Sequence, residues 1–171
     1  GSTRTDFGLN QAQRVLDGDW QHGLGGAREE AKQVVVVFTD GEPSTFSNWS
    51  GGVAANAVNL AKDLKDDKVT VYTIGMFEDA DPSDTDGRFN KYMNGVSSNY
   101  PNATATNRFG QASWNFCNLG TRVTEGNYYF AADDAEELET AFSTIADNVS
   151  TSKVAAGANT VLSDTLSEFF T

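Results

Sequence analysis

The stretch Gln33-Val-Val-Val-Val-Phe-Thr-Asp-Gly-Glu-Pro43 decides the fold class of this chain. Its residues 34–38 form a continuous apolar run that is too short for a helix. The four β-branched valines, together with the glycine and proline that follow, predict a strand. Because the run is apolar on both faces, we expect both faces to be covered, as in a parallel sheet flanked by helices.

The chemistry changes where this strand ends. Thr39 and Asp40 follow the apolar run, and Gly41 lets the backbone turn sharply. In open parallel sheets, ligands bind in the crevice at the carboxyl ends of the strands. Asp40 is therefore a candidate cation ligand or nucleophile. The alternative is that its carboxylate only hydrogen-bonds the backbone of its own turn.

Composition limits the partners. The 171 residues suffice for one domain with a real core. The net charge of −12, from 24 acidic and 12 basic residues, argues against nucleic acid and anionic membrane surfaces. No stretch is long and apolar enough to predict direct membrane insertion. The single cysteine, Cys117, excludes an intrachain disulfide framework, and we expect its thiol to be unpaired.

Helical and extended patterns alternate along the rest of the chain. Helices are predicted between Thr5 and Gly18, from Val53 to Leu64, from Phe89 to Val96 and after a cap at Asp133, and further strands at residues 69–74 and 128–131. The predicted apolar faces of the first and last helices contain Leu9, Ala12, Val15 and Leu16, and Leu138, Phe142, Ile145 and Val149. This alternation predicts an α/β, Rossmann-like parallel sheet with helices on both faces and right-handed crossovers.

Two regions interrupt or follow this pattern. Residues 97–127 form a long polar and aromatic insertion, which we expect at or beside the carboxyl edge of the sheet. There it would help to select a partner through Tyr100, Trp114 and Phe116, unless these aromatics pack a local mini-core. We expect one domain over residues 1–150. Residues 151–171 would be a linker and the start of a following domain.

The sheet needs one more strand. With only two later parallel strands to pair with, residues 34–38 could lie at an edge, where a bare apolar strand is an aggregation hazard. We therefore expect a neighbouring strand N-terminal to Gly1, and a domain that is N-terminally incomplete in this chain.

Four motifs together resemble the von Willebrand factor A domain. They are Thr3-Arg-Thr5 before a helix, Thr39-Asp-Gly-Glu-Pro43 after an apolar strand, Val71-Tyr-Thr-Ile-Gly75, and Tyr129-Phe-Ala-Ala-Asp133 before an acidic helix. The similarity runs roughly from Thr3 to Asn148, interrupted by residues 97–127. In detail, the chain resembles the A domains of Gram-positive surface proteins and pilus-tip adhesins, which implies an extracellular, cell-wall or pilus location.

The resemblance implies a metal-ion-dependent adhesion site. In the family, its ligands are a D-x-S-x-S motif after the first, central strand, a threonine of the T-x-T loop and the aspartate of T-D-G. By position, the last two are Thr3 and Asp40, whereas the D-x-S-x-S motif is absent from this chain. Hydroxyl and carboxylate oxygens suit Mg²⁺, Ca²⁺ or Mn²⁺. Because Mg²⁺ needs octahedral oxygen coordination, we expect two ligands to bind it only weakly.

The function implied by the resemblance is adhesion without turnover. A divalent cation with an open position would take a carboxylate from a host or matrix protein, or from another surface or pilus subunit. Glu42, Phe46 and Trp49 are the candidate partner contacts. The main alternative is a structural surface or pilus module with no functional metal site. An enzyme is not expected, because the nucleophile of a haloacid dehalogenase-type phosphatase would fall at Phe38, which cannot form an aspartyl phosphate.

Overall fold

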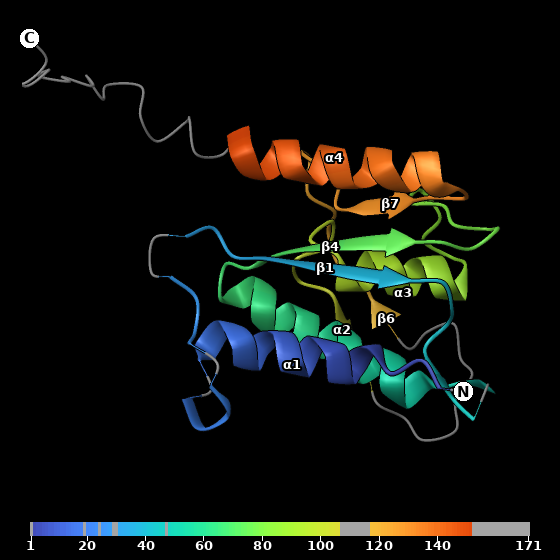
Figure 1. The fold of residues 1–171 in the computed structure, drawn as a ribbon. Coiled ribbons are helices and arrows are strands. Elements are labelled where there is room, and N and C mark those ends of the chain that lie inside the picture. Colours follow the sequence, from blue (N-terminus) through green and yellow to red (C-terminus); the bar gives the residue numbers. More distant parts are fainter. Residues whose placement is uncertain are drawn as a thin grey trace, which may run out of the picture.

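A three-stranded parallel sheet forms the centre of the molecule (Figure 1). The computed structural model describes residues 2–18, 20–23, 25–28, 31–46, 48–106 and 117–151. The sheet has the strand order β1-β4-β7, from Val34–Thr39, Thr70–Gly75 and Tyr129–Ala131. The four α-helices are α1 (Thr5–Asp17), α2 (Gly51–Asp66), α3 (Arg88–Val96) and α4 (Ala135–Thr151). The predicted α/β class, with a parallel sheet between helices, is confirmed.

Short elements complete the described chain. Trp20–His22 is a 3-10 turn, and two small antiparallel pairs are β2 (Ser44–Thr45) with β3 (Asn48–Trp49), and β5 (Thr104–Ala105) with β6 (Cys117–Asn118). The sequence patterns predicted neither pair, because two-residue strands carry no periodic signal. No helix in the described part of the chain is long and apolar enough to cross a membrane.

Strand register brings all three strand ends to one edge of the sheet. Strands β1 and β4 pair from Val34 with Thr70 to Thr39 with Gly75, and β7 joins with Ala131 opposite Gly75. Parallel pairing therefore places the segment after β1 beside the segments after β4 and β7. This carboxyl edge is where an α/β sheet forms its ligand crevice.

The two faces of the sheet bury different helices. Val71 faces the layer of α1, α2 and α3, whereas Tyr72 and Ile74 face α4 together with Ala141 and Ile145. Figure 1 shows α4 on one side of the sheet and the other three helices on the opposite side. Since side chains alternate along a strand, β4 supplies both cores.

Helix α2 ends in a buried lysine. The Nζ of Lys65 donates hydrogen bonds to the carbonyl oxygens of Gly95, Ser97 and Tyr100 at 2.9, 3.1 and 3.0 Å. These carbonyls lie at and just after the C-terminus of α3, where a helix leaves acceptors without internal donors. The ammonium group therefore ties α2 to the end of α3, and burial lowers its pKa to about 8.

Strand β1 is not covered on both faces, contrary to the expectation from its composition. It lies at the edge of the described sheet, and Val36 and Phe38 are 37% and 48% exposed. Only the alternate residues Val35 and Val37 pack on the α1–α2–α3 core. The reason is that α4 packs on β4 and β7, and of the β1 residues only Val34 is packed against the cluster on that side of the sheet.

Three details of the predicted helices are wrong. Val15 and Phe142 were placed on apolar faces but are 49% and 46% exposed. The cap of α4 is Asp134, not Asp133, since the Asp134 Oδ1 accepts the backbone N–H bonds of Glu136 and Glu137 at 2.9 Å each. A period of 3.6 residues leaves the ends of an apolar stripe uncertain, and adjacent aspartates compete for one cap.

Four apolar residues of the described part of the 97–127 insertion belong to the core. Tyr100 is only 8% exposed and packs in the main core with Ala103, Cys117 and Leu119, so the prediction that it anchors a partner is wrong. Asn59 of α2 holds β5 in place through two hydrogen bonds of 2.9 Å. Its Nδ2 donates to the carbonyl of Ala105, and its Oδ1 accepts from the N–H of Ala105. The thiol of Cys117 is free and buried. Trp114 and Phe116 lie outside the described residues.

Candidate metal and partner site

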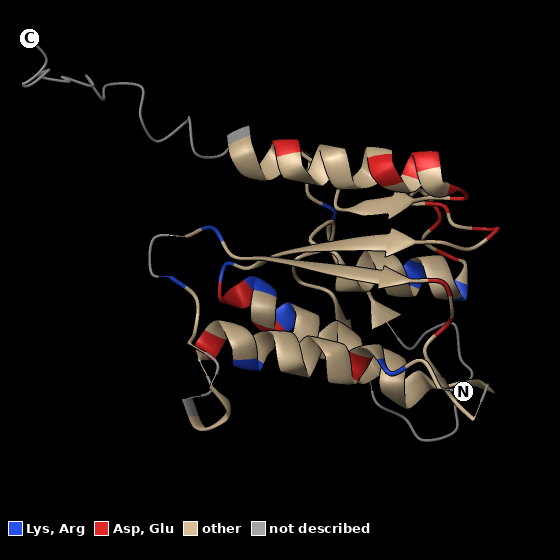
Figure 2. Cartoon of the chain, in the orientation of Figure 1, with Lys and Arg blue, Asp and Glu red and all other residues tan. Residues whose placement is uncertain are grey.

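Asp40 lies at the carboxyl edge of the sheet, directly after β1, and its side chain is exposed. Acidic residues gather around this edge in Figure 2. The turn itself is held by Thr39, whose hydroxyl donates to the Gly41 carbonyl at 2.8 Å and accepts from the Gly41 N–H at 3.2 Å. No hydrogen bond within the described residues involves the Asp40 carboxylate. Thr39 thus performs the turn-bonding role that was the alternative for Asp40.

Thr3 lies at the same corner. A Cβ atom at Gly41 would be 3.6 Å from the Thr3 Oγ1, so the hydroxyl is next to the residue that follows Asp40. Backbone bonds fix this approach: the Thr3 N–H donates to the Ser44 Oγ at 3.0 Å, and the Ser44 N–H donates to the Thr3 carbonyl at 3.1 Å. The structure therefore brings together the two predicted ligands, 37 positions apart in sequence (40 − 3).

A groove of about 500 Å³ runs from this corner between α1 and the free edge of β1. Its lining combines the Thr3–Thr5 segment and one side of α1 with most of β1, and consists of Thr3, Arg4, Thr5, Gly8, Leu9, Ala12 and residues 35–40. Successive side chains of a strand point to opposite faces of the sheet, yet consecutive residues of β1 line the groove. The groove therefore runs along the backbone edge of the strand and not over one face.

Glu42 and Trp49, both predicted partner contacts, are engaged inside the molecule. The Arg88 Nη2 donates to both carboxylate oxygens of Glu42, at 2.7 and 2.8 Å. The Arg88 guanidinium also lies over the Trp49 ring, 4.5 Å from its centroid, and Trp49 is partly buried. Arg88 was not identified from the sequence, because nothing in its local pattern points to a residue 46 positions earlier.

Phe46, the third predicted partner contact, is 90% exposed at the turn between β2 and β3. Its φ of +52° lies in the left-handed region, which a phenylalanine rarely occupies. Hydrogen bonds from its N–H to the Ser2 Oγ at 3.2 Å and from the Asn48 Nδ2 to its carbonyl at 3.3 Å hold the turn. The loop thus presents an aromatic ring to solvent next to the Thr3 segment.

Two oxygen donors lie at this corner. The Thr3 hydroxyl and the Asp40 carboxylate are oxygen donors of the kind that Mg²⁺, Mn²⁺ and Ca²⁺ prefer. Over the described ranges, no group of three or more His, Cys, Asp or Glu side chains is arranged to hold a metal ion. Full coordination would need water or donors from another segment.

The family comparison agrees with the fold. Residues 1–115 match the model of the von Willebrand factor type A domain, which includes the Thr3 loop, Asp40 and two of the three sheet strands. Searches among curated proteins and among solved structures returned no match. Since the matched region spans well over half of the 171 residues, the chain belongs to the von Willebrand factor type A domain family.

Proposed function

We propose that this chain is an adhesion module that binds a carboxylate of a partner protein through a divalent cation at the Thr3–Asp40 corner. Von Willebrand factor type A domains generally mediate protein–protein interactions. The observation that supports a metal-dependent version here is the exposed Asp40 carboxylate, which lacks an internal partner among the described residues and lies beside the Thr3 hydroxyl.

The chemistry of the corner limits the affinity. One hydroxyl and one carboxylate neutralise little of the charge of Mg²⁺ and leave most coordination positions to water. An additional strand on the free edge of β1 would end beside Asp40 if it ran parallel to β1, and could supply further ligands. A cation held this way keeps an open position that a partner carboxylate can fill.

Phe46 is the proposed partner anchor. Its ring is exposed next to the corner, and exposed aromatic side chains are preferred anchors in protein interfaces. Glu42 and Trp49 would not contact the partner directly, because both are held by Arg88. By the resemblance of the motifs, the partner would be a host or matrix protein, or another subunit, and the location a bacterial surface or pilus.

The test is Mn²⁺ binding, followed by the relaxation enhancement of water protons, which detects weak sites. The wild type should bind with a Kd of about 10⁻⁴–10⁻³ M, as open, weakly charged oxygen sites do. Asp40→Ala should weaken binding at least about tenfold by removing the charged donor of the Thr3–Asp40 pair, and should change the free energy of unfolding by less than about 0.5 kcal/mol.

The matched control is Asp63→Ala, which removes an exposed carboxylate on α2. It should leave Mn²⁺ affinity unchanged. Equal binding by the wild type and Asp40→Ala, or none by either, would refute the cation site and favour a structural module of the same family.

A further inference from the structure

Helix α3 contacts both loops of the candidate site, each time two residues beyond a candidate ligand. Arg88 pairs with Glu42, two residues after Asp40. Tyr92 shares a short hydroxyl–hydroxyl hydrogen bond with Thr5, two residues after Thr3. Because Arg88 and Tyr92 are four positions apart, they lie on the same side of α3. One helix side thus reaches two loops that are far apart in sequence.

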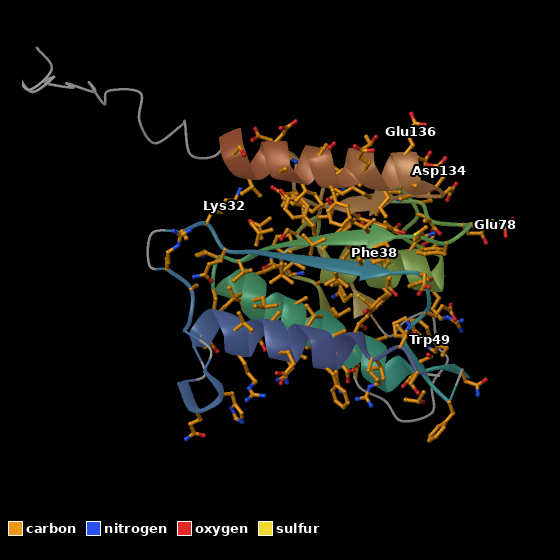
Figure 3. All side chains as sticks on the ribbon, viewed as in Figure 1. Lys32, Phe38, Trp49, Glu78, Asp134 and Glu136 are labelled. Carbon is orange, nitrogen blue, oxygen red and sulfur yellow. The ribbon has the colours of Figure 1, made fainter. Side chains whose placement is uncertain are left out.

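Trp49 joins the two contacts into one packed unit. The Arg88 guanidinium covers its ring, and the Tyr92 ring meets it edge-on, with centroids 6.3 Å apart at 88°. Tyr92 is fully buried, and burial raises the pKa of its phenol, so the hydroxyl stays protonated near neutral pH. Figure 3 shows Trp49 near the carboxyl end of the sheet. Edge-to-face arrangements at this separation are favourable for aromatic pairs.

We infer that Arg88 and Tyr92 are positioning residues that hold the Asp40 loop and the Thr3 loop, respectively, in the geometry that a shared cation requires. The affinity part of this inference rests on the proposed function. A cation that needs both oxygens binds more tightly when the loops are already arranged, because it does not have to order them. By linkage, the bound cation must stabilise the α3 contacts to the same extent.

For the loss of Arg88, electrostatics and positioning predict opposite changes in cation affinity, so the experiment can tell them apart. Removing a positive charge beside a cation site, and releasing Glu42 as a possible ligand, should tighten binding if charge alone matters. Loss of positioning should weaken it. We expect Arg88→Met to raise the Kd for Mn²⁺ by about three- to tenfold, since coupling free energies between sites typically correspond to factors of this order or larger.

Tyr92→Phe removes a single oxygen and should raise the Kd for Mn²⁺ by a smaller factor. The double variant should depart from the product of the two factors, because both residues contact Trp49 and are therefore coupled. Lys91→Met is the control: it removes a positive charge from the same helix without touching either loop, and its Kd should match that of the wild type. Wild-type affinity in both Arg88→Met and Tyr92→Phe, while Asp40→Ala loses binding, would overturn the positioning role and leave the cation site standing.

Amide hydrogen exchange without any cation tests the contacts independently of metal binding. Arg88→Met should speed exchange in residues 41–46, and Tyr92→Phe should speed exchange in residues 2–6, with Lys91→Met unchanged in both. These shifts are expected even if the wild type binds no Mn²⁺, an outcome that would refute the proposed function alone. Unchanged exchange in both segments would overturn the inference.

Discussion

Strands β1 and β4 are close in composition and differ in environment. Both have six residues, run parallel and pair with each other along their whole length. Yet Val71 and Ile74 of β4 are fully buried, whereas Val36 and Phe38 of β1 are 37% and 48% exposed. Figure 3 shows Phe38 on β1, the strand farthest from α4 in the sheet. The burial of a strand's side chains therefore depends on which helices and strands pack against it, and not on how apolar the strand is.

The same contrast divides the molecule into two sides. The closed side is β4 with the helices α2 and α3, and the open side is β1 with the groove along its edge. Around β4, the helices α2 and α3 are held together by Lys65 and by close packing at Gly95, where a Cβ would be 3.3 Å from the Val58 Cγ2 of α2. Around β1, the strand has one described neighbour and borders a groove. The candidate site lies at the end of this open strand, where added chain or a partner can reach it.

The largest expected effect tests how tightly the closed side is held. Lys65→Met leaves the buried carbonyls of Gly95, Ser97 and Tyr100 without their donor and should lower the free energy of unfolding by about 3 kcal/mol. Lys62→Met, which breaks an exposed pair with Asp66, should cost less than about 0.5 kcal/mol. Urea denaturation measures both, and equal losses would contradict the role of Lys65.

A matched pair of substitutions compares the two strands directly. Val71→Thr places a hydroxyl in the fully buried core and should cost about 2 kcal/mol. Val36→Thr makes the same chemical change on the exposed face of β1 and should cost less than about 0.5 kcal/mol. Chemical denaturation of the two variants against the wild type gives the difference. A large loss in Val36→Thr would mean that the face of β1 is covered in solution.

The smallest expected effect is a change in how the free energy of unfolding depends on pH. Burial lowers the pKa of Lys65 to about 8 and raises that of Cys117 to about 11. Above pH 8, unfolded Lys65 binds a proton that the folded state has lost, so stability rises with pH up to about 10.5. For Cys117 the sign is reversed: the unfolded thiol ionises from pH 9 while the folded thiol stays protonated, so stability is lost between pH 9 and about 11.

Cys117→Ala removes the loss of stability that the buried thiol causes between pH 9 and about 11. Relative to the wild type, its free energy of unfolding should therefore rise with pH above 9, by up to about 1.4 kcal/mol per pH unit. Urea denaturation at several values between pH 8 and 10.5, under reducing conditions, measures the two slopes. Parallel curves for the two proteins would show that burial does not perturb the Cys117 thiol.

The sequence alone determined the parallel α/β class and the position of Asp40. Runs such as Val34–Phe38 and Val69–Ile74 are too short and too β-branched for helices, and the amphipathic segments between them require crossovers, so local chemistry leaves few alternatives. The turn after β1 was likewise readable, because Thr39, Asp40 and Gly41 change the chemistry abruptly.

Only the tertiary structure decided which apolar side chains are covered and what surrounds the candidate site. Tyr100 became core, Phe38 stayed exposed, and Glu42 and Trp49 were engaged by Arg88. None of these outcomes follows from a local pattern, because each depends on contacts between residues far apart in the chain. Periodicity specifies which side of an element is apolar, whereas the packing of other elements determines what that side meets.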